Sequence, residues 1–92
     1  MEKFLIEVPH EATKLACNNA IRIFLETGSH FLRQADWGCH DGEHKAWLIV
    51  EVENREQALQ IIPSLYRSGA KVIKLHTFTK AEMENIESTH PV

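Results

Sequence analysis

The chain has 92 residues, of which 43% are hydrophobic and 25% charged, and its formal net charge is −3 at pH 7. This length and composition are ordinary for one globular domain, so we expect residues 1–92 to form a single domain. The acidic balance argues against nucleic-acid binding, which favours a basic surface. The apolar run after Lys3 is too short for a signal peptide or a membrane span, and Cys17 and Cys39 give no disulfide framework, so we expect a cytoplasmic protein.

The chain begins with an expected strand and an expected long helix. One set of alternate positions from Lys3 to Val8 is wholly apolar, which predicts a strand that ends at Pro9. From Glu11 to Thr27 the apolar residues recur at helical spacing and predict the longest helix. Cys17 lies beside the apolar stripe of that helix and is interpreted as a small core residue.

A β-hairpin is expected from His30 to Val52. Its two strands, Phe31 to Trp37 and Trp47 to Val52, are rich in aromatic and β-branched residues, and the dipeptide Asp41-Gly42 between them is typical of a two-residue type I′ turn. The cross-strand pairs that such a turn predicts on one face are Asp36 with Trp47, Gln34 with Ile49, and Leu32 with Glu51.

The second half repeats the pattern of helix and strand. Asn54 followed by Gln57 is typical of a capping box and predicts a second helix. Because Pro63 lies inside its apolar repeat, we expect this helix to kink, or to end and restart, near Ile62. The alternation from Lys71 to Thr77 predicts the last strand.

A second capping pattern, Thr79 with Glu82, predicts a short C-terminal helix. The main elements then follow in the order β-α-β-β-α-β, the split-βαβ or ferredoxin-like arrangement. We therefore predict an α+β fold with a four-stranded antiparallel sheet in the order 4-1-3-2 and the two main helices on one face.

The other face of this sheet is expected to be open. The residues predicted to lie on it are Leu5, Glu7, Leu32, Gln34, Asp36, Trp47, Ile49, Glu51, Lys74, His76 and Phe78. The large apolar side chains among them would leave a patch on the order of several hundred Å² in water, a size that usually marks an interface or a ligand site. We therefore expect a homodimer that forms through the sheet face, a small-molecule ligand on that face, or both.

From Phe4 to about Phe78, the element order and the composition of the open face resemble the dimeric α+β barrel superfamily. The resemblance implies that two ferredoxin-like units place their open faces together and enclose a cavity. The run Ser29-His30-Phe31-Leu32 and the segment from Asp41 to Trp47 are also similar to small ferredoxin-like proteins that bind nickel. No metal ligands are assigned from that second similarity.

Candidate polar groups for the cavity are His76 and Glu7, on strands that the predicted order makes neighbours. A histidine oriented by a carboxylate suits general acid–base catalysis or the anchoring of a polar ligand, and it also occurs as a purely structural pair. The expected ligand-binding residues around this pair are Trp47, Ile49, Glu51, Leu32, Gln34 and Phe78.

The hairpin also concentrates possible metal ligands. Cys39, His40 and His44 lie near its turn together with Asp36 and Glu43, and the turn would place Cys39 opposite His44. Nitrogen and sulfur donors suit zinc, nickel or copper, although the spacing matches no established zinc motif and a solvated loop tip has the same composition. A second possible set of ligands is His10, His30 and His44.

Three functions are compatible with the sequence, which specifies no cofactor. The first is a small homodimeric binding protein with an organic ligand at the open sheet face. The second is a cofactor-independent monooxygenase or isomerase of the barrel type, with His76 as acid–base group and Glu7 orienting it. The third is a divalent-metal-binding module.

Overall fold

The structure is a computed structural model that describes residues 1–27 and 29–89. Within these residues one antiparallel sheet contains the strands β1 (Glu2–Pro9), β2 (Asp36–Trp37), β3 (Lys45–Val52) and β4 (Lys71–Leu75). The sheet order is β2-β3-β1-β4. Read from the other edge, this is the predicted order 4-1-3-2, so the α+β class and the strand order are confirmed.

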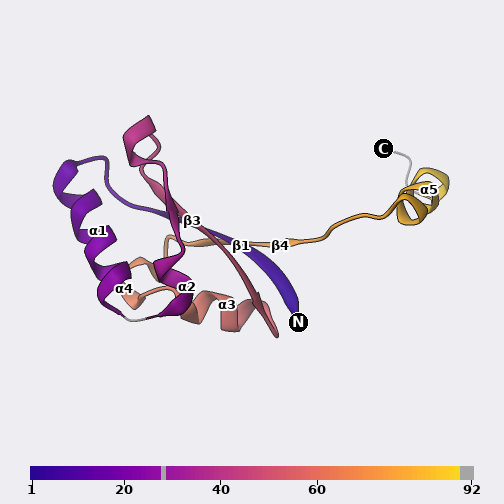
Figure 1. The fold of residues 1–92 in the computed structure, drawn as a ribbon, viewed down its shortest axis with the longest axis horizontal. Helices are drawn as coiled ribbons and strands as arrows, with labels where there is room; N and C mark the ends of the chain where they lie inside the picture. Colours follow the sequence, from indigo (N-terminus) through magenta and orange to yellow (C-terminus); the bar gives the residue numbers. More distant parts are fainter. Residues whose placement is uncertain (28, 90–92) are drawn as a thin grey trace.

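The helices of the described residues are α1 (Lys14–Glu26), α2 (His30–Arg33), α3 (Arg55–Ile61), α4 (Ser64–Arg67) and α5 (Lys80–Thr89), with a 3₁₀ turn, η1 (Cys39–Asp41). None of the helices in residues 1–27 and 29–89 is both long and apolar enough to cross a membrane. Figure 1 shows α5 far from the other helices, at the end of an extended connection after β4.

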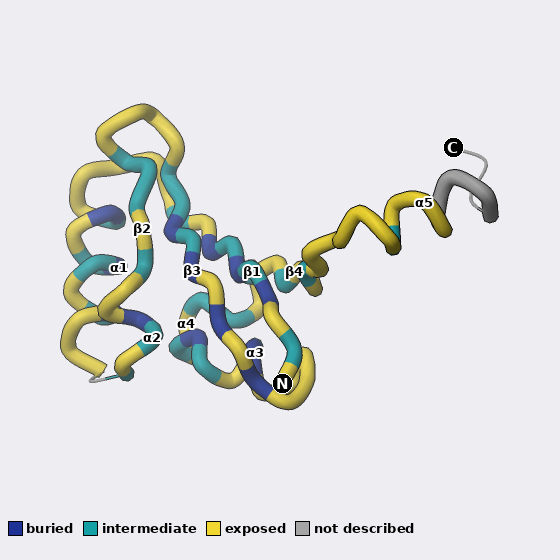
Figure 2. Tube along the Cα trace, turned by 45° about the vertical axis from the view of Figure 1, so that its right-hand side comes forward, coloured by how far each residue is buried: buried dark blue, intermediate teal, exposed yellow. Residues whose placement is uncertain are grey.

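The hydrophobic core lies between one face of the sheet and the helices. Alternate residues of β1 and β3 are buried along that face, as Figure 2 shows. The buried core residues are Phe4, Ile6, Val8, Phe24, Leu32, Ala46, Leu48, Val50, Val52, Ala58 and Ile62. Burial of these side chains away from water is the main favourable term in the folding free energy.

The helix boundaries follow their capping residues. Thr13 caps α1 by accepting a hydrogen bond from the backbone N–H of Ala16 at 3.0 Å, so the helix begins at Lys14 and not at the predicted Glu11. Asn54 caps α3 by accepting from the N–H of Gln57 at 2.8 Å, as predicted.

The expected interruption at Pro63 is also confirmed. The helix α3 ends at Ile61, Ile62 is extended, and Pro63 precedes the new helix α4. Proline has no backbone N–H and its ring clashes with the preceding helical turn, so the two helices cannot be continuous.

The predicted hairpin is correct in register but wrong in length. Asp36 pairs with Trp47, as predicted, yet β2 contains only residues 36–37 and the segment His30–Arg33 is the helix α2. The side chain of Leu32 is 2% exposed in the core, so its predicted place on the open face is wrong. Apolar side chains at positions 31, 32 and 35 fit a helical turn as well as a strand, and packing of Leu32 beneath the sheet selects the helix.

The predicted two-residue turn is replaced by a longer loop. A type I′ turn needs positive φ at both central residues, and among the described residues only Gly42, with φ of 82°, has it. The chain instead forms η1, and the backbone N–H groups of Gly38 and Glu43 donate to the carbonyls of Lys45 (3.1 Å) and Gly38 (2.9 Å).

The predicted face of the last strand is wrong. In the register of β1 with β4, Lys74 is opposite Phe4, whose side chain is in the core, and Ile73 is opposite Leu5. Ile73 therefore lies on the open face and Lys74 on the helix side, while His76 and Phe78 follow the end of β4. Because β4 is a largely exposed edge strand, its hydrophobic pattern specifies the register weakly.

Candidate metal centre

Three elements bring His10, Cys39 and His44 together, and we call these residues the donor cluster. Pro9, the last residue of β1, pairs with Lys45, the first residue of β3, so the adjoining residues His10 and His44 are neighbours. The backbone N–H of His10 donates to the carbonyl of His44 at 3.0 Å. The loop through η1 then places Cys39 beside both imidazoles.

The ligand atoms of the donor cluster are close enough to share one ion. One atom from each of the three side chains lies within 4.8 Å of the other two. His10 Nε2 is 3.2 Å from Cys39 Sγ, and the rings of His10 and His44 meet edge to face with centroids 5.8 Å apart.

A backbone contact orients the imidazole of His10. Its Nδ1 is 2.9 Å from the carbonyl oxygen of Glu11, to which it donates when that nitrogen carries the proton. Nε2 then presents its lone pair toward Cys39. Histidines that bind metals commonly donate their second ring N–H to a carbonyl in this way, because the contact fixes both tautomer and ring orientation.

The imidazole of His44 has an unsatisfied nitrogen. Its Nδ1 is buried and has no hydrogen-bond partner among the described residues. A buried polar atom without a partner costs about 1–3 kcal/mol, so such an atom in a native fold requires an explanation. A cation bound through Nδ1 would satisfy this nitrogen.

The thiol of Cys39 is held in its neutral form. Burial, followed by a hydrogen bond and charge interaction with the thiol of Cys17, raises the pKa of Cys39 from 9.0 to about 11. In the metal-free protein Cys39 is therefore a thiol at neutral pH. Metal binding must displace its proton, and the positive charge of the ion would stabilise the thiolate.

Tight packing supports the loop that carries Cys39. A Cβ atom at Gly38 would lie 2.8 Å from both the Glu43 carbonyl oxygen and the Trp47 ring, so only glycine fits there without rearrangement. The Trp37 ring packs on Phe24 of the core with centroids 4.9 Å apart, and it lies 6.1 Å from the ring of His10. The donor cluster is thus connected to the core through Trp37.

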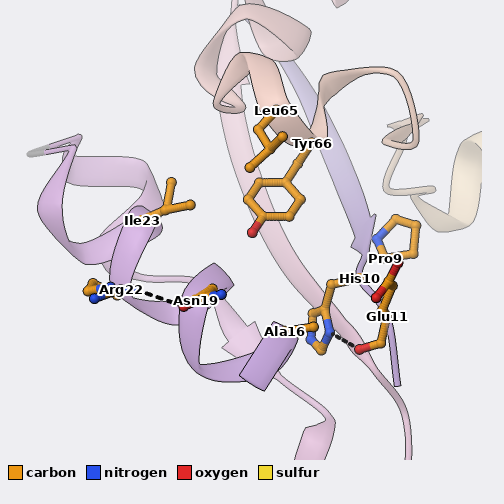
Figure 3. A pocket seen from close by; sticks show the side chains of 9 residues that line it. All are labelled: Pro9, His10, Glu11, Ala16, Asn19, Arg22, Ile23, Leu65 and Tyr66. Carbon is orange, nitrogen blue, oxygen red and sulfur yellow. Dashed lines mark hydrogen bonds between the residues drawn. The ribbon is translucent and has the colours of Figure 1, made fainter. Parts of the chain in front are cut away.

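Two hollows adjoin the donor cluster. One, of about 580 Å³, lies between α1 and the loop, and its lining residues are Thr13, Lys14, Cys17, Asn18, Ile21, Trp37, Cys39, His40 and His44. The other, of about 530 Å³, lies between α1, α4 and the end of β1 and includes His10 (Figure 3). Burial raises the pKa of Tyr66 in this second hollow, so its hydroxyl stays protonated.

The open face contains six of the residues predicted for it, namely Leu5, Glu7, Asp36, Trp47, Ile49 and Glu51. Trp47 is opposite Glu7, and its indole N–H donates to Glu7 Oε1 at 3.2 Å. Ile49 and Glu51 follow on the same face of β3. A shallow hollow of about 270 Å³ lies here, and its lining residues are Leu5, Gln34, Asp36, Trp47, Leu48 and Ile49.

The structure does not bring His76 and Glu7 together. Glu7 is opposite Lys71 at the start of β4, whereas His76 follows the end of that strand. His76 Nε2 instead lies 2.7 Å from Glu82 Oε2 of α5, and its ring packs against Phe78 with centroids 4.7 Å apart.

Sequence reasoning named every member of the donor cluster but did not combine them. Cys39 and His44 are expected near one turn, and His10 is placed with His44 in a second set that also contains His30. The side chain of His30 is instead on α2, 3.5 Å from Gln34 Nε2. The signal that was missing is the loop conformation through η1, which places Cys39 beside His10 and His44 once the pairing of β1 with β3 has made these two histidines neighbours.

No family model, no curated protein and no solved structure matches the chain. The interpretation of the donor cluster therefore depends on its own geometry and chemistry.

Proposed function

We propose that the protein is a divalent-metal-binding module whose ligands include His10, Cys39 and His44. The observation that carries the proposal is the convergence, within 4.8 Å, of the imidazole that follows β1 with an imidazole and a thiol from the loop between β2 and β3. Nitrogen and sulfur donors favour zinc, nickel, cobalt or copper over magnesium or calcium, which prefer oxygen ligands.

The unsatisfied Nδ1 of His44 supports a metal over a simple hydrogen-bonded cluster. The contact of His10 with Cys39 satisfies those two side chains without any ion. It leaves His44 Nδ1 buried without a partner among the described residues. A metal ion bound through Nδ1 of His44 would satisfy all three donors at once, whereas the hydrogen-bonded cluster satisfies two.

The fold that positions these ligands is proposed to be a ferredoxin-like βαββαβ unit. The antiparallel order β2-β3-β1-β4 and the helices between the strands support this assignment. The second strand is short because α2 occupies most of its expected length. A metal ion at the donor cluster would crosslink the end of β1 to the loop between β2 and β3.

Equilibrium dialysis of the tag-free protein against Zn²⁺, Ni²⁺ and Co²⁺ tests the proposal. We expect uptake of one ion per chain, with affinity lowered at least ~100-fold in His44→Ala and in Cys39→Ser, because each loses a direct ligand. His40→Ala is the matched control, since His40 is exposed in the same loop and lies outside the donor cluster. No stoichiometric uptake, or an equal loss in His40→Ala, would contradict the proposal.

A second candidate is a homodimer that holds a small organic ligand between two open faces. It is supported by the exposed apolar side chains Ile49 (61%) and Ile73 (37%), which lie beside the pair of Trp47 and Glu7. Sedimentation velocity tests it: the wild type should sediment as a dimer and Ile49→Lys as a monomer. A monomeric wild type at high micromolar concentration would remove this candidate.

A further inference from the structure

Cys17 occupies an unusual place for a buried cysteine. It is 9% exposed and lies on the inward stripe of α1 with Ala20 and Phe24. Cys17 lines the same hollow as Cys39 and His44, and it lies outside the main cluster of core residues. The sequence interpretation of Cys17 as a simple core residue therefore leaves its contact with the loop unexplained.

The start of α1 fixes the position of Cys17. Thr13 caps the helix, and the backbone N–H of Cys17 donates to the carbonyl of Thr13 at 3.0 Å in the first turn. This places Cys17 on the wall of the hollow that Cys39 and His44 also line. Two thiols and two imidazoles thus surround one region between α1, β1 and the loop.

We propose that Cys17 is the fourth ligand, so that the site is a closed Cys₂His₂ centre selective for zinc. This inference rests on the proposed function. Zinc prefers four tetrahedral ligands, and a site with four protein ligands leaves no position for a water or a substrate. Cys17 is outside the group of atoms within 4.8 Å of one another, so ligation requires its side chain to move toward Cys39.

The fourth ligand decides what the metal does. With His10, Cys39 and His44 alone, the ion keeps an open position toward the hollow beside Ile21 and Trp37, which is the arrangement of a catalytic zinc. With Cys17 bound, the ion instead joins α1 to β1 and the loop and acts as a structural crosslink. The two arrangements differ in the number of thiolates on the metal.

Cobalt substitution counts those thiolates. In the Co²⁺-loaded wild type we expect tetrahedral visible bands and an intense thiolate-to-cobalt charge-transfer band. In Cys17→Ser the charge-transfer intensity should fall to about half, because one of two thiolates is lost. Asn18→Ala is the matched control, because Asn18 lines the same hollow and is no thiolate donor.

An unchanged charge-transfer band in Cys17→Ser, with Co²⁺ still bound, would overturn the Cys₂His₂ assignment and leave the proposed metal binding standing. Failure of the wild type to bind Co²⁺ or Zn²⁺ would overturn both. The two outcomes are therefore distinguishable.

Proton release gives a readout that needs no variant. Both cysteines must lose their protons to bind the metal, so calorimetric titration with Zn²⁺ at pH 7 in buffers of different ionisation enthalpy should show about two protons released by the thiols of the wild type. One proton would exclude Cys17 as a thiolate ligand. We also expect Zn²⁺ to protect both thiols from alkylation, whereas an exposed and reactive Cys17 in the loaded protein would contradict the proposal.

Discussion

The donor cluster and the open face differ in the kind of atoms that they leave without partners. The donor cluster is partly buried and includes a nitrogen of His44 that no described residue satisfies. On the open face, the indole N–H of Trp47 and the carboxylate of Glu7 satisfy each other, and what remains uncovered is apolar surface such as Ile49. Unsatisfied polar atoms specify a ligand chemistry, whereas an exposed apolar face specifies only that something covers it.

The largest expected effect on the free energy of unfolding comes from substitutions on the two faces of β3. Leu48 is 4% exposed in the core and Ile49, the next residue, is 61% exposed on the open face. Leu48→Ala should lower the free energy of unfolding by about 2–5 kcal/mol, because it leaves a cavity. Ile49→Ala should change it by less than about 0.5 kcal/mol in a monomer.

Urea denaturation measures both substitutions. Repeating it over a wide range of protein concentration shows whether Ile49 is buried in a dimer, because stability then depends on concentration. If Ile49→Ala lowers the free energy of unfolding strongly at every protein concentration, including the lowest that the assay allows, the exposed position of this side chain is contradicted.

Metal binding at the donor cluster should stabilise the fold by a smaller amount. Zn²⁺ at 100 times its dissociation constant should raise the free energy of unfolding by ~2.7 kcal/mol, if the unfolded chain has no affinity for the ion. For a domain of this size each kcal/mol corresponds to roughly 4–8 °C in Tm. Differential scanning calorimetry with and without a chelator measures the shift.

The shift should vanish in His44→Ala and remain in His40→Ala. A Zn²⁺-dependent shift of equal size in His44→Ala would show that the ion binds elsewhere. Stabilisation by Zn²⁺ that does not depend on the donor cluster would indicate that other histidines of the chain bind the ion.

The smallest expected effect concerns the exposed pair of His76 and Glu82. The hydrogen bond from His76 is the main cause that lowers the pKa of Glu82 below its usual 4.5. Because the folded-state pKa is lowered, the contribution of this pair to stability is present above pH 4.5 and is lost as the pH falls through the lowered value. NMR titration of the Glu82 carboxyl should give a midpoint below 4.5 in the wild type and a higher midpoint in His76→Ala.

Equal midpoints in the two proteins would show that His76 does not contact Glu82 in solution. The result also bears on the open face. A histidine engaged with Glu82 is not available as the partner of Glu7 that the sequence suggested.

Local patterns predicted the parts of the fold that local physics controls. The capping residues Asn54 and Thr79 and the break at Pro63 are all found where the sequence placed them. The alternation in β1 placed Phe4 and Ile6 in the core. Each of these features depends on residues a few positions apart, so the sequence contains the whole signal.

The errors fall where packing between distant segments decides. Residues 30–35 fit a helix or a strand, and the place of Leu32 in the core decided for the helix. The predicted face of β4 is wrong because this edge strand is largely exposed and has no fully buried residue, so its sequence does not specify that Ile73 lies on the open face and Lys74 on the helix side.

The sequence by itself determined the order of the elements, the alternating core strands, the helix caps and a chain with two thiols and six histidines. Only the tertiary structure decided which of these donors meet. His10 and His44 are 34 positions apart, and the register of β1 with β3 makes them neighbours. Side-chain periodicity specifies which face of a strand is buried, whereas the meeting of ligands from distant segments depends on long-range pairing and packing, which no local pattern encodes.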